Sequence, residues 1–305
     1  MAKKNLTMEQ FVAEVVADME QRFPNAEVST KEVTKNNGRV LTALLINEGN
    51  NITPSIYLNA YYEVGDMSVK DACDAIEKAY NRNKMDSDMD FSWVMDFDKV
   101  SNKIVFNLVN TERNASLLAT IPHVDYLDLA YIFKIMVGDM VDNGTATITI
   151  TNNIAESWGK SAEELMEIAK ANQYKLCGEN KVQNMTDLIY EMEGKPMGMS
   201  RDEFVTMVGE MPMAVVTNEK MLYGCYVGFD KNVLADLSEN CNNLAILPSS
   251  IHECIVVPYE KLGISLEELK DMPMSVNATE VAPEEVLSDN VYVYDVNTRE
   301  ISIVE

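Results

Sequence analysis

The chain has 305 residues, 47% of them hydrophobic and 24% charged, and its 49 acidic and 25 basic residues give a net charge of −24. A chain of this size and hydrophobic content buries a sizeable core, which excludes a mainly disordered protein. The acidic surface repels phosphate backbones and anionic lipids, so we expect no nucleic-acid partner and no membrane partner.

The first elements follow clear local signals. Thr7 and Gln10 form a capping-box pattern, and apolar residues then recur at helical spacing as far as Phe23, which predicts a helix with one buried face. Strands are predicted at residues 27–35 and 39–46, because Asn-Asn-Gly between them suits a hairpin turn. A further strand is expected at residues 52–58 and a helix at residues 68–83.

The middle of the chain carries the clearest hairpin pattern. A strand is predicted at residues 104–109 and a short helix at residues 111–119. Apolar residues then alternate from Leu127 to Val137, and an Asp-Asn-Gly turn at residues 142–144 leads into a returning strand. Ser161 and Glu164 cap the next predicted helix.

The stretch at residues 178–200 contains three glycines and a proline, so we predict a linker or mobile loop there. Beyond it, the pattern predicts a capped helix from Ser200, a hairpin over residues 213–229, a helix over residues 231–239 and a strand over residues 251–257. Another capped helix follows Ser265, and a final hairpin ends the pattern.

Helices and hairpins mix in this pattern without regular strand–helix alternation. This favours an α+β fold with mainly antiparallel sheets rather than a doubly wound fold. We expect two α+β lobes, an N-terminal one at residues 1–118 and a C-terminal one at residues 119–305.

Cysteine usage and the first residues both bear on the compartment. The five cysteines are odd in number and widely spaced, without a CxxC pair, which is typical of a reduced intracellular chain. Glu9, Glu14, Asp18 and Glu20 interrupt the first apolar series, which therefore does not resemble a signal peptide. We expect a cytoplasmic protein.

Several strong catalytic and cofactor motifs are absent from the sequence: the phosphate loop, the dinucleotide fingerprint, HExxH and the nucleophile elbow GxSxG. We therefore expect no cofactor. Asp86, Asp88 and Asp90 resemble the start of a calcium loop and are the candidate metal ligands. Phe91 stands where such a loop needs glycine, so a solvated acidic loop is the favoured interpretation.

Residues 247–258, LPSSIHECIVVP, form the candidate active site, because they hold one of only two histidines in the chain. If residues 251–257 are a strand, His252 and Glu253 point to opposite faces, and Glu253 cannot orient the imidazole. Ser250 and Cys254 share the histidine's face, although such positions lie roughly 6–7 Å apart. The alternative is a histidine that satisfies backbone groups.

Four segments carry a resemblance to known families: LPSSIHECIVVP, VNATEVAPEEVLSDNVYVY, VNTERNASLLATIPHVDYLDLAYIF and NITPSIYLNAYY. Together they resemble an uncharacterised domain-of-unknown-function family of gut clostridia. The PSSIHE segment is also similar to the YtpQ-like bacterial family. The resemblance implies a cytoplasmic bacterial protein and carries no catalytic residue across. It also implies that residues 248–253 and 277–289 meet in the fold.

Two functional hypotheses remain open. The favoured one is a non-catalytic binding or interaction protein, with a protein partner as one option. The alternative is a hydrolase or transferase that uses His252 with Ser249, Ser250 or Cys254, which requires the imidazole to lie within hydrogen-bond reach of the nucleophile.

Overall fold

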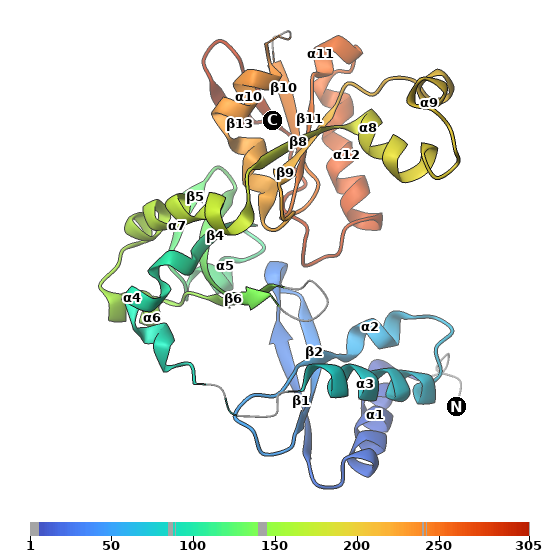
Figure 1. The fold of residues 1–305 in the computed structure, drawn as a ribbon, viewed down its shortest axis with the longest axis vertical. Helices are drawn as coiled ribbons and strands as arrows, with labels where there is room; N and C mark the ends of the chain where they lie inside the picture. The colour runs from blue at the N-terminus through green and yellow to red at the C-terminus, as the bar shows by residue number, and fades with distance from the viewer. Residues whose placement is uncertain are drawn as a thin grey trace. The chain divides into compact units, whose positions relative to one another are not determined.

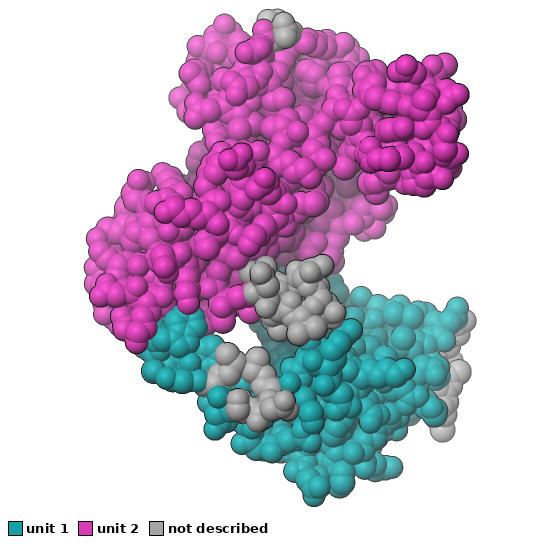
Figure 2. All heavy atoms as spheres, viewed as in Figure 1, with its two compact units in different colours: residues 1–93, 141–143 teal, residues 94–140, 144–305 magenta. Residues whose placement is uncertain are grey.

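The computed structural model describes residues 6–84, 88, 90–139, 145–239, 241 and 243–304. The chain divides into two compact units, residues 1–93 with 141–143 and residues 94–140 with 144–305, called unit 1 and unit 2 below (Figure 2). The strand Ile104–Asn110 pairs within unit 2. Each unit is an α+β arrangement, as the sequence predicted.

Unit 1 combines an antiparallel sheet of order β1-β2-β3 with helices (Figure 1). The predicted first hairpin is confirmed, and its turn residues Asn37 and Gly38 have φ values of 61° and 67°. The elements are α1 (Met8–Arg22), β1 (Glu27–Thr34), β2 (Val40–Asn47), β3 (Ile56–Tyr57), α2 (Leu58–Glu63) and α3 (Val69–Asn83).

The joint between α1 and α3 is closed by apolar packing. The predicted capping box starts α1, with Thr7 accepting from the Gln10 backbone N–H. The buried residues of the joint come from both helices, whereas Val12, Val16 and Phe23 of the same apolar stripe are half-buried. The buried residues from α1 are Phe11, Val15 and Met19, and those from α3 include Ala72, Cys73, Ile76 and Tyr80.

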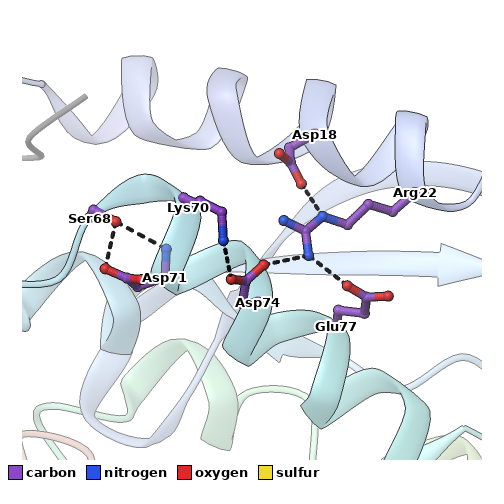
Figure 3. A network of polar contacts seen from close by, with 7 residues as sticks. All are labelled: Asp18, Arg22, Ser68, Lys70, Asp71, Asp74 and Glu77. Atoms are coloured by element: carbon purple, nitrogen blue, oxygen red, sulfur yellow. Dashed lines mark hydrogen bonds and ion pairs between the residues drawn. The ribbon is translucent and has the colours of Figure 1, made fainter.

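Charged groups add a polar network to the same joint (Figure 3). The Arg22 guanidinium pairs with Asp18 on its own helix and reaches Asp74 and Glu77 of α3, at 2.8 Å and 2.6 Å. Hydrogen bonds to these carboxylates raise the pKa of Arg22. One cation on α1 therefore links it to α3 through two of its three anionic partners, Asp74 and Glu77.

Unit 2 begins with a sheet of order β4-β6-β5, in which β7 pairs with the later part of β6. Every residue of β4 is buried, because α7 and the 3₁₀ helix Gly224–Phe229 both pack against it. The elements are α4 (Phe97–Val100), β4 (Ile104–Asn110), α5 (Ala115–Leu118), β5 (His123–Tyr126), β6 (Leu129–Asp139), β7 (Thr145–Thr149), α6 (Asn152–Trp158) and α7 (Ala162–Cys177).

The predicted strand from Leu127 is wrong at its start. Leu127 has a φ of 56° and turns the chain between β5 and β6. The pairing of β6 with β7 confirms the predicted hairpin, whose turn at residues 142–144 lies outside the described residues.

The second sheet of unit 2 has the order β13-β12-β10-β11-β9-β8, and all its recorded pairs are antiparallel. Figure 1 shows α12 alongside β10 and β11. The elements are β8 (Asn180–Asn184), α8 (Met185–Ile189), α9 (Arg201–Val208), β9 (Ala214–Asn218), α10 (Lys231–Leu237), β10 (Asn243–Pro248), β11 (Cys254–Val257), α11 (Tyr259–Leu262), α12 (Leu266–Thr279), β12 (Tyr292–Asp295) and β13 (Glu300–Ile303).

The stretch at residues 178–200, predicted as a linker or mobile loop, contains regular secondary structure. It holds β8, which pairs with β9 over five residues, then α8 and the π-helical turn Tyr190–Gly194. The sequence of β8, NKVQN, is mostly polar because the strand lies at the sheet edge, and so it lacks the apolar alternation that marks a strand. The predicted hairpin over residues 213–229 keeps only its first strand, and the 3₁₀ helix replaces the second.

One hydrophobic core joins the two sheets of unit 2. Leu108 and Leu129 of the first sheet belong to the same buried cluster as Val216, Leu244 and Tyr292 of the second. Within the described residues, no helix is long and apolar enough to cross a bilayer.

Candidate functional site

The segment at residues 247–258 forms the hairpin of β10 and β11 in the interior of the second sheet. Its strand begins at Cys254, three residues later than predicted, because residues 249–253 make the connection. The Ser250 N–H donates to the Glu253 carbonyl at 3.1 Å, and the His252 N–H donates to Ser250 Oγ at 3.0 Å. The strand-face argument that separated His252 from Glu253 therefore does not apply.

The imidazole of His252 is partly exposed, at 27% of its side chain, and is held from three sides. Its Nδ1 accepts from the Tyr223 backbone N–H at 3.2 Å. The ring stacks on the Tyr223 ring, with centroids 5.8 Å apart and planes at 12°, and its Nε2 lies 3.8 Å from Glu285 Oε1. Because Nδ1 accepts, the neutral ring carries its proton on Nε2, facing Glu285.

Burial lowers the pKa of His252, the Glu285 carboxylate and a hydrogen bond with the Met221 backbone act to raise it, and the Lys134 ammonium adds the smallest effect, which lowers it. The imidazole is therefore neutral at neutral pH. A neutral, partly exposed imidazole is able to act as a general base. It needs a proton donor within reach to do so.

The neighbouring candidate nucleophiles do not provide such a donor. Cys254 is fully buried, its Sγ donates to the Cys225 carbonyl at 3.3 Å, and burial raises its pKa well above the ordinary thiol value. The Ser250 hydroxyl accepts a hydrogen bond from the backbone N–H of His252 and makes no hydrogen bond with its ring among the described contacts. Within the described residues, no hydrogen bond joins the imidazole to the side chains of Ser249, Ser250 or Cys254.

The loop that carries Tyr223 is strained against this turn. Met221 and Tyr223 have φ values of 52° and 54°, a region that costs energy for residues with a side chain. A Cβ on Gly224 would lie 2.7 Å from the His252 carbonyl oxygen, so only glycine allows this approach. Strain of this kind collects at functional sites, although here it also fixes the His252 turn.

Sequence reasoning missed Tyr223 and Lys134 entirely. The Lys134 ammonium donates to Tyr223 Oη at 3.2 Å and lies 4.8 Å from the centroid of its ring. Lys134 lies on β6 and Tyr223 about ninety residues later, and no short motif links them. Only the fold brings them together.

The segments that the family resemblance linked do meet. The Ile251 N–H donates to the Glu285 carbonyl at 2.8 Å, and Glu285 faces the His252 ring. Farther along, Asn277 Nδ2 donates to the Ser288 carbonyl and to Asp289 Oδ1, which ties α12 to the connection before β12.

Beside this turn lies a pocket of about 260 Å³ between α12 and the β10–β11 hairpin, called the apolar pocket below. Carbon and sulfur atoms form almost all of its wall, and the polar residues in it are Ser249 and Asn277. It is lined by Met213, Leu247, Pro248, Ser249, Ile255, Val257, Ile264, Leu269, Met272, Pro273, Val276 and Asn277. Three of the four residues of the LPSS stretch, Leu247, Pro248 and Ser249, therefore line a cavity.

The His252 turn and the apolar pocket both lie inside a region that matches a family model. Residues 8–296 match the family described as "Family of unknown function (DUF5688)". The chain belongs to this family. No curated protein and no solved structure matches the chain.

In this DUF5688 member the described aspartates of the acidic loop accept hydrogen bonds from within the chain. Asp88 accepts from the Asn51 N–H at 2.8 Å, and Asp90 accepts from Ser92, while Asp86 lies outside the described residues. Among the described residues, no group of three or more His, Cys, Asp or Glu side chains is placed to hold a metal ion.

Proposed function

We propose that this DUF5688 member is a non-catalytic binding protein whose apolar pocket takes a small, uncharged, largely apolar molecule. The observation that carries the proposal is a cavity of about 260 Å³ whose wall is almost wholly apolar. Ligand sites are concave and mostly apolar, with a few polar groups that fix orientation. A wall of this kind disfavours a charged ligand, because the charge would lose its hydration without gaining a partner.

The helix that roofs the pocket is suited to adapt to a ligand. Met272 is 45% exposed although it lines the pocket, and methionine side chains change shape at low cost. Pro273 lies inside α12 and lacks the N–H that would bond to the Leu269 carbonyl, which weakens the helix at this point. The roof therefore yields more readily than the β-sheet floor.

One polar atom narrows the ligand chemistry. Within the described residues Asn277 Oδ1 is buried without a hydrogen-bond partner, while Asn277 Nδ2 is fully used. An unsatisfied buried acceptor costs about 1–3 kcal/mol, which a ligand hydroxyl would recover once the α12 roof yields and opens this atom to the pocket. An engineered cavity of about 150 Å³ holds benzene, so a two-ring alcohol suits this larger space.

Binding of 2-naphthol, naphthalene and 2-naphthoate by the purified chain tests the proposal. We expect 2-naphthol to bind about three- to tenfold more tightly than naphthalene, through the Asn277 acceptor. We expect 2-naphthoate to bind at least about tenfold more weakly than 2-naphthol, because its charge stays unpaired.

Two matched isoleucine substitutions locate the site. Ile255→Phe fills the pocket, whereas Ile303→Phe adds the same volume on β13, away from it. We expect at least a tenfold loss of 2-naphthol affinity for Ile255→Phe alone. Equal affinity for both variants, with folding verified by circular dichroism, would contradict the proposal.

The alternative, a hydrolase or transferase that uses His252, has weaker support. Its nucleophile would be Ser249, Ser250 or Cys254, and the contacts above leave each of these side chains apart from the imidazole. A fluorophosphonate probe for serines and iodoacetamide for thiols distinguish the two functions. Labelling of Ser249, Ser250 or Cys254 in the native protein, lost in His252→Gln, would favour the enzyme.

We also infer that the protein acts in the bacterial cytoplasm. The buried cysteines include Cys73 and Cys225, both free thiols, and burial raises the pKa of each to about 12. Inert, reduced thiols suit a reducing compartment. The resemblance to a family of gut clostridia supports a bacterial source, and the net charge of −24 supports partners other than nucleic acids and membranes.

A further inference from the structure

Unit 2 contains a second cavity of different chemistry, about 460 Å³ in volume, called the aromatic pocket below. It lies where the first sheet, α7 and the 3₁₀ helix Gly224–Phe229 come together. Six aromatic rings line it: Phe106, Tyr126, Tyr131, Tyr174, Tyr226 and Phe229. No prediction from the sequence pointed to it, because its residues come from β4, β5, β6, α7, β8 and the 3₁₀ helix with the residue after it.

The rings of the aromatic pocket meet edge to face. Phe106 lies at 89° to Tyr131 and at 79° to Tyr226, with centroids 5.3 Å and 5.0 Å apart. Tyr126 lies at 82° to Phe229. Because neighbouring rings stand at right angles, they cannot all direct their edges into the pocket. Some ring faces therefore form part of its wall, and these faces carry the negative part of the aromatic quadrupole.

Two carboxylates add negative charge to the same wall, those of Asp125 and Asp230. Asp230 is held by hydrogen bonds, because its Oδ1 accepts from the Asn232 N–H at 2.9 Å and its Oδ2 accepts from Asn180 Nδ2 at 3.3 Å. The Tyr226 hydroxyl extends this chain by donating to Asn180 Oδ1 at 3.2 Å. Burial chiefly raises the pKa of Tyr226, and the Asp230 charge raises it further.

One cation, Lys170, also lines the pocket, and its ammonium pairs with Glu167 Oε1 at 3.0 Å. The lysine reduces the negative potential of the wall without reversing it, since two carboxylates face one ammonium. An anion would meet both carboxylates and the ring faces. A hydrated metal ion would find too few oxygen ligands, because no metal-binding cluster is formed within the described residues.

We propose that the aromatic pocket binds an organic ammonium ion, a cation with an apolar body. Aromatic faces attract such cations within about 6 Å of the ring centroid, and a nearby carboxylate compensates the lost hydration. The site is separate from the apolar pocket, and the proposal does not depend on the function proposed above. Its ligand differs from the apolar ligand by charge rather than by size.

Choline and its neutral isostere 3,3-dimethylbutan-1-ol are the probes, titrated into the full-length chain by calorimetry. They share one shape and differ in charge, so shape alone cannot separate them. We expect choline to bind at least about tenfold more tightly than the alcohol, and this preference to weaken as salt concentration rises. Equal affinities, or heat from neither probe, would overturn the proposal.

Three variants assign the effect to the wall. Tyr126→Leu removes one ring and should weaken choline binding about three- to tenfold. Asp230→Asn removes a charge but keeps a good N-cap for α10, so it should weaken choline binding about threefold or more without unfolding the helix. Lys170→Gln should tighten choline binding. Unchanged choline affinity in Tyr126→Leu and Asp230→Asn, with melting temperatures retained, would also overturn it.

Discussion

The α1–α3 joint of unit 1 and the contact of α12 with the second sheet of unit 2 start from the same local signal and end differently. A capping box begins α1 at Thr7 and α12 at Ser265. Along α1 the apolar stripe is sealed, with Phe11 and Met19 fully buried. Along α12 the methionines stay exposed and a pocket remains.

The difference shows what separates a structural joint from a binding site. The α1–α3 joint combines a continuous apolar stripe with an arginine that neutralises carboxylates on both helices. The α12 contact has Leu269 and Pro273 as its buried residues, and its charged pair, Lys270 with Glu267, lies on the helix itself. A helix that is capped well but packed sparsely keeps its shape and leaves room for a ligand.

A matched pair of methionine substitutions gives the largest expected contrast. Met19→Ala removes a side chain that is 0% exposed and should lower the free energy of unfolding by about 2–5 kcal/mol. Met272→Ala removes one that is 45% exposed and should cost less than about 1 kcal/mol. Urea denaturation followed by circular dichroism measures both.

Hydrogen exchange then assigns each loss to its helix, since Met19→Ala should speed the exchange of α1 amides and not of α12 amides. Met272→Ala should instead change the affinity for 2-naphthol. Similar stability losses in the two variants would mean that α12 is packed as tightly as α1, and the contrast between the joints would fail.

The ion-pair network gives the next effect. Arg22→Gln leaves Asp18, Asp74 and Glu77 close together without their shared cation, and should cost about 1–2 kcal/mol. Lys70→Gln is the control, because Lys70 is 77% exposed and pairs only with Asp74 among the described contacts, so its loss should leave the free energy of unfolding almost unchanged.

Salt sharpens this test. In 1 M NaCl the difference in free energy of unfolding between Arg22→Gln and the parent chain should become smaller, because salt screens the attraction between charges. If the loss persists unchanged in high salt, the arginine acts through packing of its aliphatic stem and not through its charge.

The sequence predicted the elements that depend on local chemistry. The capping boxes of α1, α7, α9 and α12 and the hairpin β1–β2 were all placed from short patterns. It failed where tertiary context decides: β8 is polar because it is an edge strand, and the chain at Ile251 bends because Glu285 takes its N–H.

The site was predictable only as a segment. The sequence singled out His252, and the structure surrounds it with Tyr223, Glu285 and a bent turn rather than a nucleophile. The apolar pocket forms where Leu247, Val257 and Leu269 come together from three elements. The spacing of these residues in the sequence does not indicate a pocket. The aromatic pocket depends even more on long-range assembly.

The smallest expected effect concerns pH, and it too separates the two regions. In the α1–α3 joint, hydrogen bonds raise the pKa of Arg22 and lower the pKa of Asp74, so both groups keep their charge between pH 5 and pH 7.5 and add no slope. In unit 2, burial lowers the pKa of His252 below its ordinary 6.5 and raises the pKa of Glu253 above its ordinary 4.5.

These shifts have opposite signs. Below pH 6.5 the unfolded chain binds a proton at His252 that the folded chain resists, so this histidine makes stability fall as pH falls from 6.5 toward its lowered pKa. Glu253 stabilises the fold most in acid, and its contribution is lost as pH rises from 4.5 through its raised pKa. Urea midpoints of His252→Gln and Glu253→Gln across pH 5–7.5 therefore change slope in opposite directions. A His252→Gln variant with the parent slope would show that the Glu285 contact offsets burial of the ring, and the bent turn would then be as insensitive to pH as the α1–α3 joint.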